Sequence, residues 1–278
     1  MPELPEVETI RRELAPLLVE KKIRSVLVVR KDIVGFPGPR KFAEEVTGRK
    51  ILGLARRGKY LIFKLDKGKE LIFHLRLSGQ LQVRKNGNEP RFERVCFGLS
   101  DRKVLSFIEP RALGRVYLVA AGHYPGVLLG MEQMGFEPIS PEFTVDYLAG
   151  KLRERKAKVK SLLLNQRVCC GVGNIYSDEA LFRAGVRPTR PGGSLTGSEV
   201  KKLVRSLSRV INDGIRWCGT SLDDGRYVRP GSRQGVFQQH LRVFGREGLQ
   251  CKTIGCREII RRTRIGNRSS YFCPVCQK

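Results

Sequence analysis

Four cysteines near the C-terminus have the spacing of a metal site. Cys251 and Cys256 form one close pair and Cys273 and Cys276 the other, in the pattern C-x4-C-x16-C-x2-C. Each pair can supply two thiolates to one side of a tetrahedral Zn²⁺ while the segment between them forms a hairpin. The spacing predicts one structural zinc ion. The alternatives are four unpaired thiols or, in an oxidising compartment, disulfides.

The segment between the two cysteine pairs, REIIRRTRIGNRSS, contains five arginines. A zinc-held hairpin with arginines at its tip could enter a groove of a nucleic acid. The same arginines could equally form a solvated face.

The chain opens MPELPEVETI, with proline directly behind the initiator methionine. Removal of Met1, which small residues such as proline normally permit, would leave Pro2 with the only α-amine of the chain. An α-amine has a pKa of about 8, so a useful fraction is uncharged near neutral pH and can act as a nucleophile. The residues alone leave open whether Pro2 reacts or has no chemical role.

Charge is the most unusual property of the composition. The 278 residues include 53 Lys and Arg against 27 Asp and Glu, a formal net charge of +26. Such an excess attracts polyanions, and nucleic acid is the leading partner because neutralised phosphates release condensed counterions. A membrane surface is disfavoured, since the basic residues are spread along the chain. We find no apolar run long enough to span a bilayer and no secretory signal, so we expect a cytoplasmic protein with reduced thiols.

The elements that must position these residues follow from the hydrophobic pattern. Residues 6–20 place Val7, Ile10, Leu14 and Leu17 at helical spacing, and Thr9 with the early glutamates suits a helix start. From about 22 to 120, short β-branched and aromatic runs separated by turn signals predict an antiparallel sandwich or barrel. The chain is long enough for two or more domains.

Beyond about 130 the pattern becomes helical. Helices are predicted at 144–152, 157–165, 174–184 and 196–217, followed by a long Gly- and Arg-rich loop at 219–236. Residues 241–278 are too few to fold on apolar burial alone. The predicted domains are therefore 2–131, 132–236, which includes the loop, and 241–278.

The stretch AKVKSLLLNQRVCCGVGNIYSDEALFRAG indicates a helix, a glycine-containing hairpin and a second helix that Asn174 begins. The N–H groups at such a helix start can bind phosphate. Lys156 and Lys160 are four apart and are predicted to share one face of the preceding helix. The alternative is a helix corner whose glycines, Gly171 and Gly173, serve steric needs only.

Neither the histidines nor the remaining cysteines show metal-like spacing. We interpret His74 in LIFHLRL as a buried, hydrogen-bonded histidine. Core packing is the interpretation for the scattered cysteines, which are Cys96, Cys169, Cys170 and Cys218.

Several segments match one family in the same order, from residue 2 to 278. These are PELPEVET, RRGKYLIF, HLRLSG, EPRALG, GVGNIY, VFGREG and RSSYFCPVCQK. Together they resemble the bacterial formamidopyrimidine-DNA glycosylases. The full PELPEVET favours this branch over the related endonuclease VIII branch, which typically opens differently after Pro-Glu.

The resemblance implies an enzyme that excises oxidised purines from duplex DNA and then nicks the strand. Its architecture is an N-terminal β-sandwich with an N-terminal helix, a helix–two-turn–helix domain and a C-terminal zinc finger. By the match, Pro2 is the nucleophile, Glu3 the general acid and Glu6 an orienting group. Lys59 matches the proton donor of β-elimination, and Arg268 matches the arginine of δ-elimination.

The match also assigns DNA-binding positions, which are Arg111, Lys156, Asn174, His74, Leu77 and Leu113. Arg111 would fill the gap left by the flipped nucleotide, since C1′ is closed to attack within the stack. The family usually has a methionine and an aromatic residue beside this arginine, where the chain has Leu77 and Leu113. Phe92 stands where a histidine commonly contacts phosphate.

These departures, with the slightly longer loop at 219–236, leave the lesion preference open. The expected substrates are oxidised guanine and ring-opened purines. The alternatives are an endonuclease VIII-like glycosylase for oxidised pyrimidines and a non-enzymatic zinc-containing nucleic-acid binder. The expected partner is damaged double-stranded DNA, without a nucleotide cofactor or membrane, and we expect a monomer acting on the bacterial nucleoid.

Overall fold

The computed structural model describes residues 2–222, 225 and 227–278 and divides into two compact units. The first unit runs up to Gln133 and also includes Trp217–Val236. The second consists of Met134–Arg216 and Phe237–Lys278. Among the described residues, no helix is long and apolar enough to cross a membrane.

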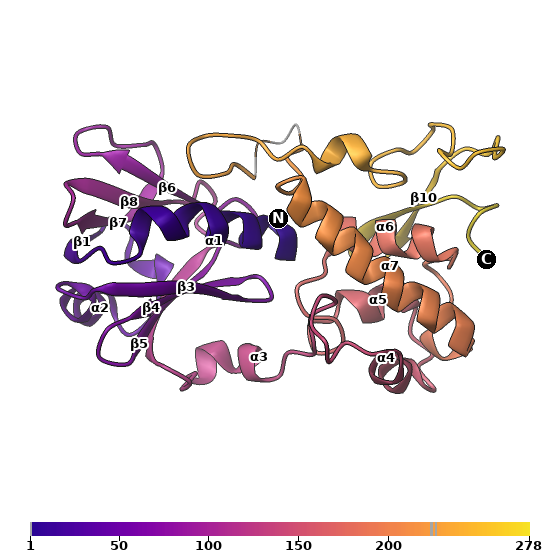
Figure 1. Cartoon of the computed structure of the whole chain (residues 1–278), viewed down its shortest axis with the longest axis horizontal. Helices are drawn as coiled ribbons and strands as arrows, with labels where there is room; N and C mark the ends of the chain where they lie inside the picture. The colour runs from indigo at the N-terminus through magenta and orange to yellow at the C-terminus, as the bar shows by residue number, and fades with distance from the viewer. Residues whose placement is uncertain (1, 223–224, 226) are drawn as a thin grey trace. The chain divides into compact units, whose positions relative to one another are not determined.

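Two β-sheets enclose the core of the first unit (Figure 1). One sheet has the strand order β1-β7-β8-β6 and the other β2-β9-β5-β4-β3. The named strands pair antiparallel except β2 with β9, which are parallel. The predicted β-sandwich is therefore confirmed, and the barrel alternative is wrong. The strands are β1 Ile23–Val28, β2 Val34–Phe36, β3 Ile51–Arg57, β4 Tyr60–Leu65, β5 Lys69–His74, β6 Gln80–Lys85, β7 Glu93–Leu99, β8 Lys103–Ile108 and β9 Arg115–Ala120.

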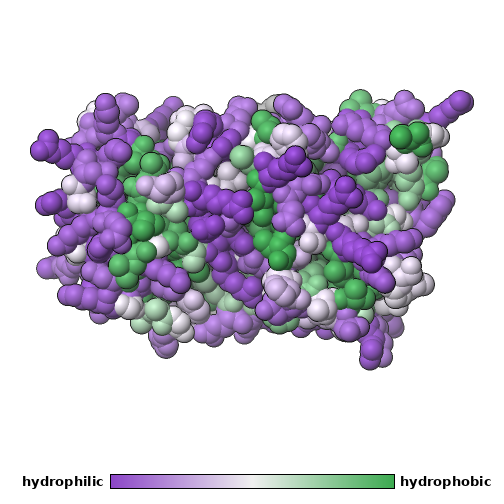
Figure 2. All heavy atoms as spheres, viewed as in Figure 1, coloured by the Kyte–Doolittle hydropathy of each residue, from purple (hydrophilic) through white to green (hydrophobic). Residues whose placement is uncertain are grey.

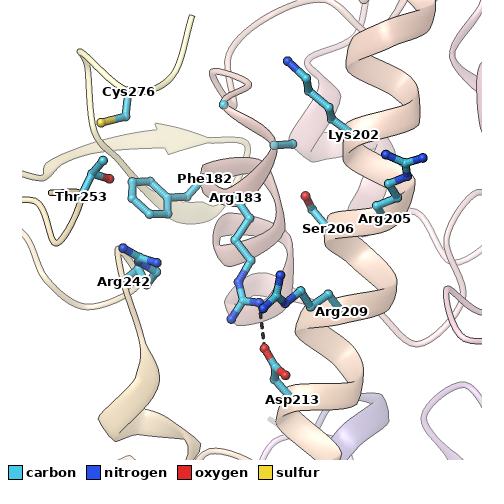
Figure 3. A pocket seen from close by; sticks show the side chains of 12 residues that line it. Phe182, Arg183, Lys202, Arg205, Ser206, Arg209, Asp213, Arg242, Thr253 and Cys276 are labelled. Atoms are coloured by element: carbon cyan, nitrogen blue, oxygen red, sulfur yellow. Dashed lines mark hydrogen bonds and ion pairs between the residues drawn. The ribbon is translucent and has the colours of Figure 1, made fainter.

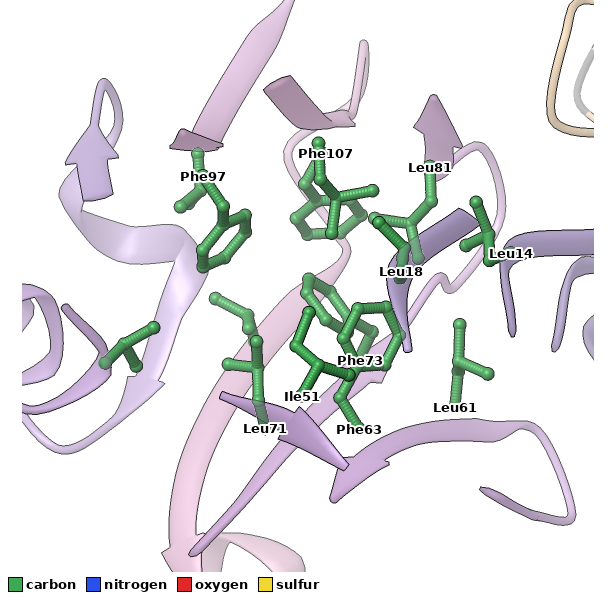
Figure 4. Packing of buried hydrophobic residues seen from close by; sticks show 14 of the residues in the cluster. Leu14, Leu18, Ile51, Leu61, Phe63, Leu71, Phe73, Leu81, Phe97 and Phe107 are labelled. Carbon is green, nitrogen blue, oxygen red and sulfur yellow. The ribbon is translucent and has the colours of Figure 1, made fainter. Parts of the chain in front are cut away.

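Aromatic side chains join the two sheets across this core (Figure 4). Phe73 of β5 lies with its ring centroid 5.1 Å from that of Phe63 on β4, in the same sheet. Its ring also meets Phe97 of β7 at 5.9 Å and Phe107 of β8 at 5.5 Å, both edge-on. Such edge-to-face pairs add to the stabilisation from buried area.

The first helix, α1, spans Leu4–Leu18 and starts two residues before its predicted start. Thr9 lies in the second turn, where its hydroxyl donates to the Pro5 carbonyl at 2.8 Å. Val7, Ile10 and Leu14 are buried as predicted, but Leu17 is 39% exposed and Leu18 is buried instead. A step of eleven residues is just over three turns at 3.6 residues per turn, so Leu18 returns to the face of Val7.

A second helix, α2 at Pro39–Val46, lies in the region that was predicted to contain only strands. Phe42 and Val46 are buried one turn apart, and Pro39 occupies the first turn. Two turns are too short for the helical period to stand out from the surrounding strand pattern. The first unit also contains α3 Leu129–Glu132 and the 3₁₀ helices η1 Lys31–Ile33 and η2 Gly126–Leu128.

The second unit is built around α6. This helix packs against α5, α7 and strand β11, and α4 packs against α7. The elements are α4 Val145–Leu152, α5 Val159–Leu164, α6 Asn174–Ala184, η3 Gly192–Ser194, α7 Gly197–Arg216, η4 Phe237–His240, β10 Arg261–Ile265 and β11 Arg268–Phe272. β10 and β11 form an antiparallel hairpin between the two cysteine pairs.

Residues 217–236, which the sequence analysis grouped with the helical segment, pack within the first unit. Tyr227 belongs to the core of that unit, and its hydroxyl donates to the Cys218 carbonyl at 3.0 Å. Of the predicted loop 219–236, positions 223, 224 and 226 lie outside the described residues. The domain boundaries stay a prediction.

Candidate functional site

The start of α1 brings Pro2, Glu3 and Glu6 together in a buried position. Glu3 caps the helix, and its side chain accepts from the backbone N–H of Glu6. Glu6 Oε2 in return accepts from the Glu3 backbone N–H at 2.8 Å. This reciprocal capping box fixes the two carboxylates directly behind Pro2.

The second carboxylate oxygen of Glu6 holds the loop that follows α7. Glu6 Oε1 accepts a hydrogen bond from the backbone N–H of Thr220 at 2.9 Å. Gly219 has φ +80°, and a Cβ there would lie 2.9 Å from Glu6 Oε1. A glycine is needed here, because any side chain would both strain the backbone and collide with the carboxylate.

Lys59 and His74 lie at adjacent strand ends of the five-stranded sheet. Lys59 directly precedes β4 and is only 8% exposed, while His74 ends β5. His74 Nδ1 accepts from the Arg76 N–H at 3.1 Å, and its ring meets Tyr60 edge-on. Burial, then the charges of Arg76 and Lys59, lower the pKa of His74 to about 3. The imidazole is therefore buried and hydrogen-bonded, as predicted, and the lowered pKa keeps it neutral near pH 7.

The carboxylate of Glu109 organises the turns that carry Leu77, Arg111 and Leu113. It is fully buried, and Ser78 Oγ donates to its Oε1. The backbone N–H of Arg111 donates to the same oxygen at 3.1 Å, and that of Gly114 donates to Oε2 at 2.7 Å. One side chain thus links the β5–β6 turn to the β8–β9 turn.

The residues held by these turns project outward. The Arg111 side chain is exposed, Leu113 is 42% exposed and Leu77 is partly buried. A Cβ at Gly114 would lie 2.9 Å from Glu109 Oε2, so glycine permits the close approach. The arrangement presents an arginine and two leucines from neighbouring turns of one rigid support.

Phe92 lies beside the same support. Its carbonyl accepts from the Glu109 backbone N–H at 3.0 Å. The ring is partly exposed, with the guanidinium carbons of Arg91 and Arg94 at 4.6 and 5.5 Å from its centroid. The position where a histidine is common in the family is therefore an aromatic ring in cation–π contact with two arginines.

In the second unit, Gln166 closes the hairpin between α5 and α6. Its Oε1 accepts from the Gly171 N–H at 2.9 Å, and its Nε2 donates to the Val172 carbonyl at 2.9 Å. Asn174 begins α6 as predicted, and its buried Oδ1 accepts no hydrogen bond from the described residues. The side-chain carbonyl oxygen at this helix start is thus a buried acceptor without a partner among the described residues.

The prediction that Lys156 and Lys160 share one helical face is wrong. Helix α5 begins only at Val159, so Lys156 precedes it and is exposed. Lys160 is fully buried, 2.8 Å from Asp178 Oδ1, and also donates to the Ser269 carbonyl at 2.8 Å. Burial acts to raise the pKa of Asp178, and the Lys160 ammonium opposes this rise. Lys160 has a structural role, and Lys156 alone can meet an outside anion.

The four C-terminal cysteines converge as the spacing predicts. Their Sγ atoms lie within 4.8 Å of one another, with Cys251–Cys276 and Cys256–Cys273 both at 3.8 Å. Tetrahedral Zn²⁺ with Zn–S bonds of about 2.3 Å needs sulfur atoms about 3.8 Å apart. The residues therefore fit a zinc ion.

The four cysteines outside this cluster differ in burial. Cys169 and Cys170 are core residues, while Cys96 and Cys218 are only partly buried.

Arg268 begins β11, opposite Ile265 on β10, and is exposed. The hairpin is anchored behind it, because Asp178 of α6 accepts from Ser270 Oγ at 2.8 Å and from the Tyr271 N–H at 3.0 Å. The hairpin tip therefore presents its arginine from a fixed base on α6.

Comparisons with known proteins agree with this arrangement along the whole chain. Residues 1–116 match the formamidopyrimidine-DNA glycosylase N-terminal domain, and 134–224 match the H2TH domain of the same enzymes. Residues 248–278 match the zinc finger found in FPG and IleRS. The chain belongs to the formamidopyrimidine-DNA glycosylase family.

Curated relatives of the family support this over their full length. The formamidopyrimidine-DNA glycosylase of Pelotomaculum thermopropionicum is 40% identical, with 100% of this chain and 99% of that protein aligned. The crystal structure of the Thermus thermophilus MutM (FPG) protein superposes with a TM-score of 0.90 at 38% identity, covering 99% and 98% of the two chains. The Lactococcus lactis FPG in complex with Fapy-dG-containing DNA gives 0.90 at 31% identity, covering 99% and 100%.

Sequence reasoning missed the residues that hold the glycosylase-family site in place. Glu109 was visible in EPRALG, but its role depends on contacts with turns distant in sequence. Gln166 and Thr220 likewise act through backbone groups, for which no residue spacing gives a signal. Glu13 and Gln82 were also missed, and they bind the segment around Arg229.

Proposed function

We propose that this chain is a bifunctional DNA glycosylase and AP lyase of base-excision repair that removes 8-oxoguanine and formamidopyrimidines from duplex DNA. The observation that carries the proposal is the buried capping box of Glu3 and Glu6 directly behind Pro2, in a chain of this family. The bacterial relatives support action on nucleoid DNA in the cytoplasm. A monomer suffices, since one chain holds all the proposed catalytic residues.

Base excision begins at the α-amine of Pro2 after removal of Met1. The nitrogen lone pair attacks C1′ of the damaged nucleotide, the glycosidic bond breaks, and the base leaves with the bonding electrons and takes up a proton. The new N–H proton is lost, and Glu3 gives a proton to O4′ as the C1′–O4′ bond opens. The product is an iminium between Pro2 and C1′, and Glu6 orients the amine end of α1.

The iminium then drives strand scission. A secondary amine gives an iminium with no N–H to lose, so the positive charge persists and acidifies C2′. Loss of a C2′ proton expels the 3′ phosphate, and Lys59 is the proton donor of this β-elimination. A second elimination, δ-elimination, is assisted by Arg268 and expels the 5′ phosphate. Water finally hydrolyses the iminium and frees Pro2.

The remaining site residues hold the DNA in our proposal. Arg111 enters the space of the flipped nucleotide, and Leu77 and Leu113 wedge the neighbouring base steps. The neutral His74, with Nδ1 occupied, can donate from Nε2 to a phosphate. Lys156 and Asn174 bind the backbone from the second unit. Zinc, when bound, holds the fold of the hairpin that carries Arg268.

Borohydride trapping tests the nucleophile. The wild type should form a covalent adduct with an 8-oxoguanine duplex, because reduction converts the iminium into a stable amine. Pro2→Gly and protein that retains Met1 should lose the adduct while binding an uncleavable abasic duplex normally. An undiminished adduct in both would remove Pro2 from the reaction.

Oxidised pyrimidines are the second candidate substrate, favoured by the replacement of the usual methionine and aromatic wedge by Leu77 and Leu113. Single-turnover excision of 8-oxoguanine and thymine glycol in matched duplexes separates the two preferences. Affinity for duplex DNA should fall steeply with salt in either case. A flat salt response would argue against phosphate neutralisation as the main binding contribution.

A further inference from the structure

A basic cavity lies in the second unit at the C-terminal end of α6. It has a volume of about 730 Å³, and its walls are formed by α6, α7 and the C-terminal segment 241–278, which carries the four cysteines. One lining residue, Asp213, carries a carboxylate. Five are cationic, namely Arg183, Lys202, Arg205, Arg209 and Arg242. Four thiolates around Zn²⁺ add formally two negative charges nearby, so the lining stays net positive.

Cationic side chains line the cavity from several elements, and Figure 3 shows how they lie. Arg205 and Arg209 stand one turn apart on α7, and Arg209 extends toward Arg183 of α6. The only ion pair drawn among them joins Arg183 to Asp213 at 2.7 Å. On the facing wall, the Arg242 guanidinium lies over the Phe182 ring at 5.5 Å. This many like charges around one cavity favours an anionic occupant.

None of the residues that we assign to DNA in this unit, which are Lys156, Asn174 and Arg268, lines the cavity. Asn174 begins α6 and the cavity lies at its other end, about 15 Å along the helix axis. Arg268 begins β11, and the cavity-lining Cys276 comes four residues after the end of that strand, whose length is about 15 Å. The cavity residues therefore have no part in the proposed contacts to the damaged duplex.

Two exposed aliphatic residues are sequence neighbours of cavity-lining residues, and they indicate which class of anion fits. Ile254 is fully exposed and directly follows the cavity-lining Thr253. Val275 is about half exposed and directly precedes Cys276, which also lines the cavity. Figure 2 shows hydrophobic atoms at the surface of this C-terminal part. Exposed aliphatic groups beside a charged cavity suit a protein partner, because a phosphate backbone gains nothing from them.

We propose that this cavity, defined by Arg183, Arg205, Arg209 and Arg242, binds a short acidic segment of a partner protein that also carries aliphatic side chains. Carboxylates of an extended segment meet the guanidinium groups on α7 and α6, with Lys202 at the edge. Its aliphatic side chains cover Ile254 and Val275. The site would let the enzyme hold a partner through residues other than those that we assign to DNA.

Fluorescence anisotropy with the full-length zinc-loaded protein tests this proposal. The probe is fluorescein-labelled Asp-Asp-Glu-Ile-Asp-Leu-Glu. Arg205→Glu and Arg209→Glu should each weaken binding at least tenfold. Lys201→Glu is the matched control, since it makes the same charge change on the same exposed helix outside the cavity, and it should bind within twofold of wild type. Replacing Ile and Leu of the probe by Ser should also weaken binding severalfold.

Excision of 8-oxoguanine should be unchanged in all three variants, which separates this site from the proposed active site. Equal peptide affinity in the three variants would overturn the proposal. It would also fail if Arg205→Glu and Arg209→Glu weakened undamaged duplex binding much more than Lys201→Glu, because the surface would then be a nucleic-acid site.

Discussion

The Glu6 carboxylate and the backbone N–H of Thr220 are joined by a 2.9 Å hydrogen bond across 214 positions of the chain. The other oxygen of the same carboxylate holds the Glu3 N–H. The loop after α7 and the proposed catalytic helix start therefore share one buried acceptor. A movement of the loop near Thr220 would therefore shift the Glu6 carboxylate and, through it, the Glu3 backbone next to Pro2.

Gly219→Ala tests this coupling. The new Cβ would strain a backbone at φ +80° and collide with Glu6, so we expect a loss of about 2 kcal/mol or more in the free energy of unfolding. Excision should slow with it. Gly231→Ala is the matched control, with φ +77° in the same loop but a Cβ that would meet only Arg233 Nε, at an ordinary contact distance of 3.9 Å. Urea denaturation and single-turnover excision measure both, and equal effects in the two variants would refute the coupling.

Glu109→Gln should uncouple the turns that carry Leu77 and Leu113. The amide replaces one acceptor oxygen by a donor that faces other donors, at a cost of about 1–3 kcal/mol in unfolding free energy. Excision should fall while affinity for undamaged duplex changes little, because the phosphate contacts remain. The exposed Glu89→Gln, in the same unit, should leave both unchanged. Excision at the wild-type rate in Glu109→Gln would show that the turns need no such link.

The sequence predicted those parts of the molecule that depend on local pattern. The cysteine spacing, the helix at Asn174 and the strand-rich first region each arise from neighbours along the chain, and all three are confirmed. Lys160 shows the limit of such reasoning. Its spacing from Lys156 predicted one shared face of a helix, but its ammonium is buried against Asp178, a partner that only the packing of α5 on α6 provides.

The same limit explains the missed positioning residues. Glu109 and Gln166 act by accepting from backbone N–H groups, and a backbone group leaves no signature in residue type. The proposed catalytic residues could be named because the family motifs contain them. The groups that hold them could be found only from distances between atoms.

The pH dependence of stability should reveal His74. Burial, with the charges of Arg76 and Lys59, lowers its pKa in the native state to about 3, against 6.5 in the unfolded chain. The unfolded state therefore takes up a proton first as pH falls. The contribution of His74 is complete above pH 6.5 and is lost progressively between 6.5 and 3. His74→Gln should flatten the stability curve in that window, measured by urea denaturation. A native His74 that titrates near 6.5 by NMR would contradict this.

Loss of zinc should affect the second unit selectively. Cys273→Ser removes one of four ligands, so metal analysis should fall from one zinc per chain to near none, and affinity for duplex DNA should drop at least tenfold. The only tryptophan, Trp217, belongs to the first unit, and its emission should stay native-like. Cys96→Ser, outside the cluster, is the control and should retain metal. A wild type without zinc would refute the assignment.

The buried pair of Lys160 and Asp178 should couple the second unit to the hairpin arginine. Lys160→Met leaves the Asp178 carboxylate without its counter-charge, at an expected cost of about 3–5 kcal/mol in unfolding free energy. Adding Asp178→Asn removes that charge but keeps an oxygen to accept from Ser270 and Tyr271, so the double variant should recover most of the loss.

The products of strand scission provide a second test of the Lys160–Asp178 pair. Lys160 also binds the carbonyl of Ser269, the neighbour of Arg268, so Lys160→Met should accumulate the product of β-elimination relative to that of δ-elimination. Gel analysis of the cleaved strand measures the ratio at a temperature where the variant is folded. An unchanged ratio in the presence of a clear stability loss would mean that Lys160 supports only the fold and that Arg268 is positioned by the hairpin alone.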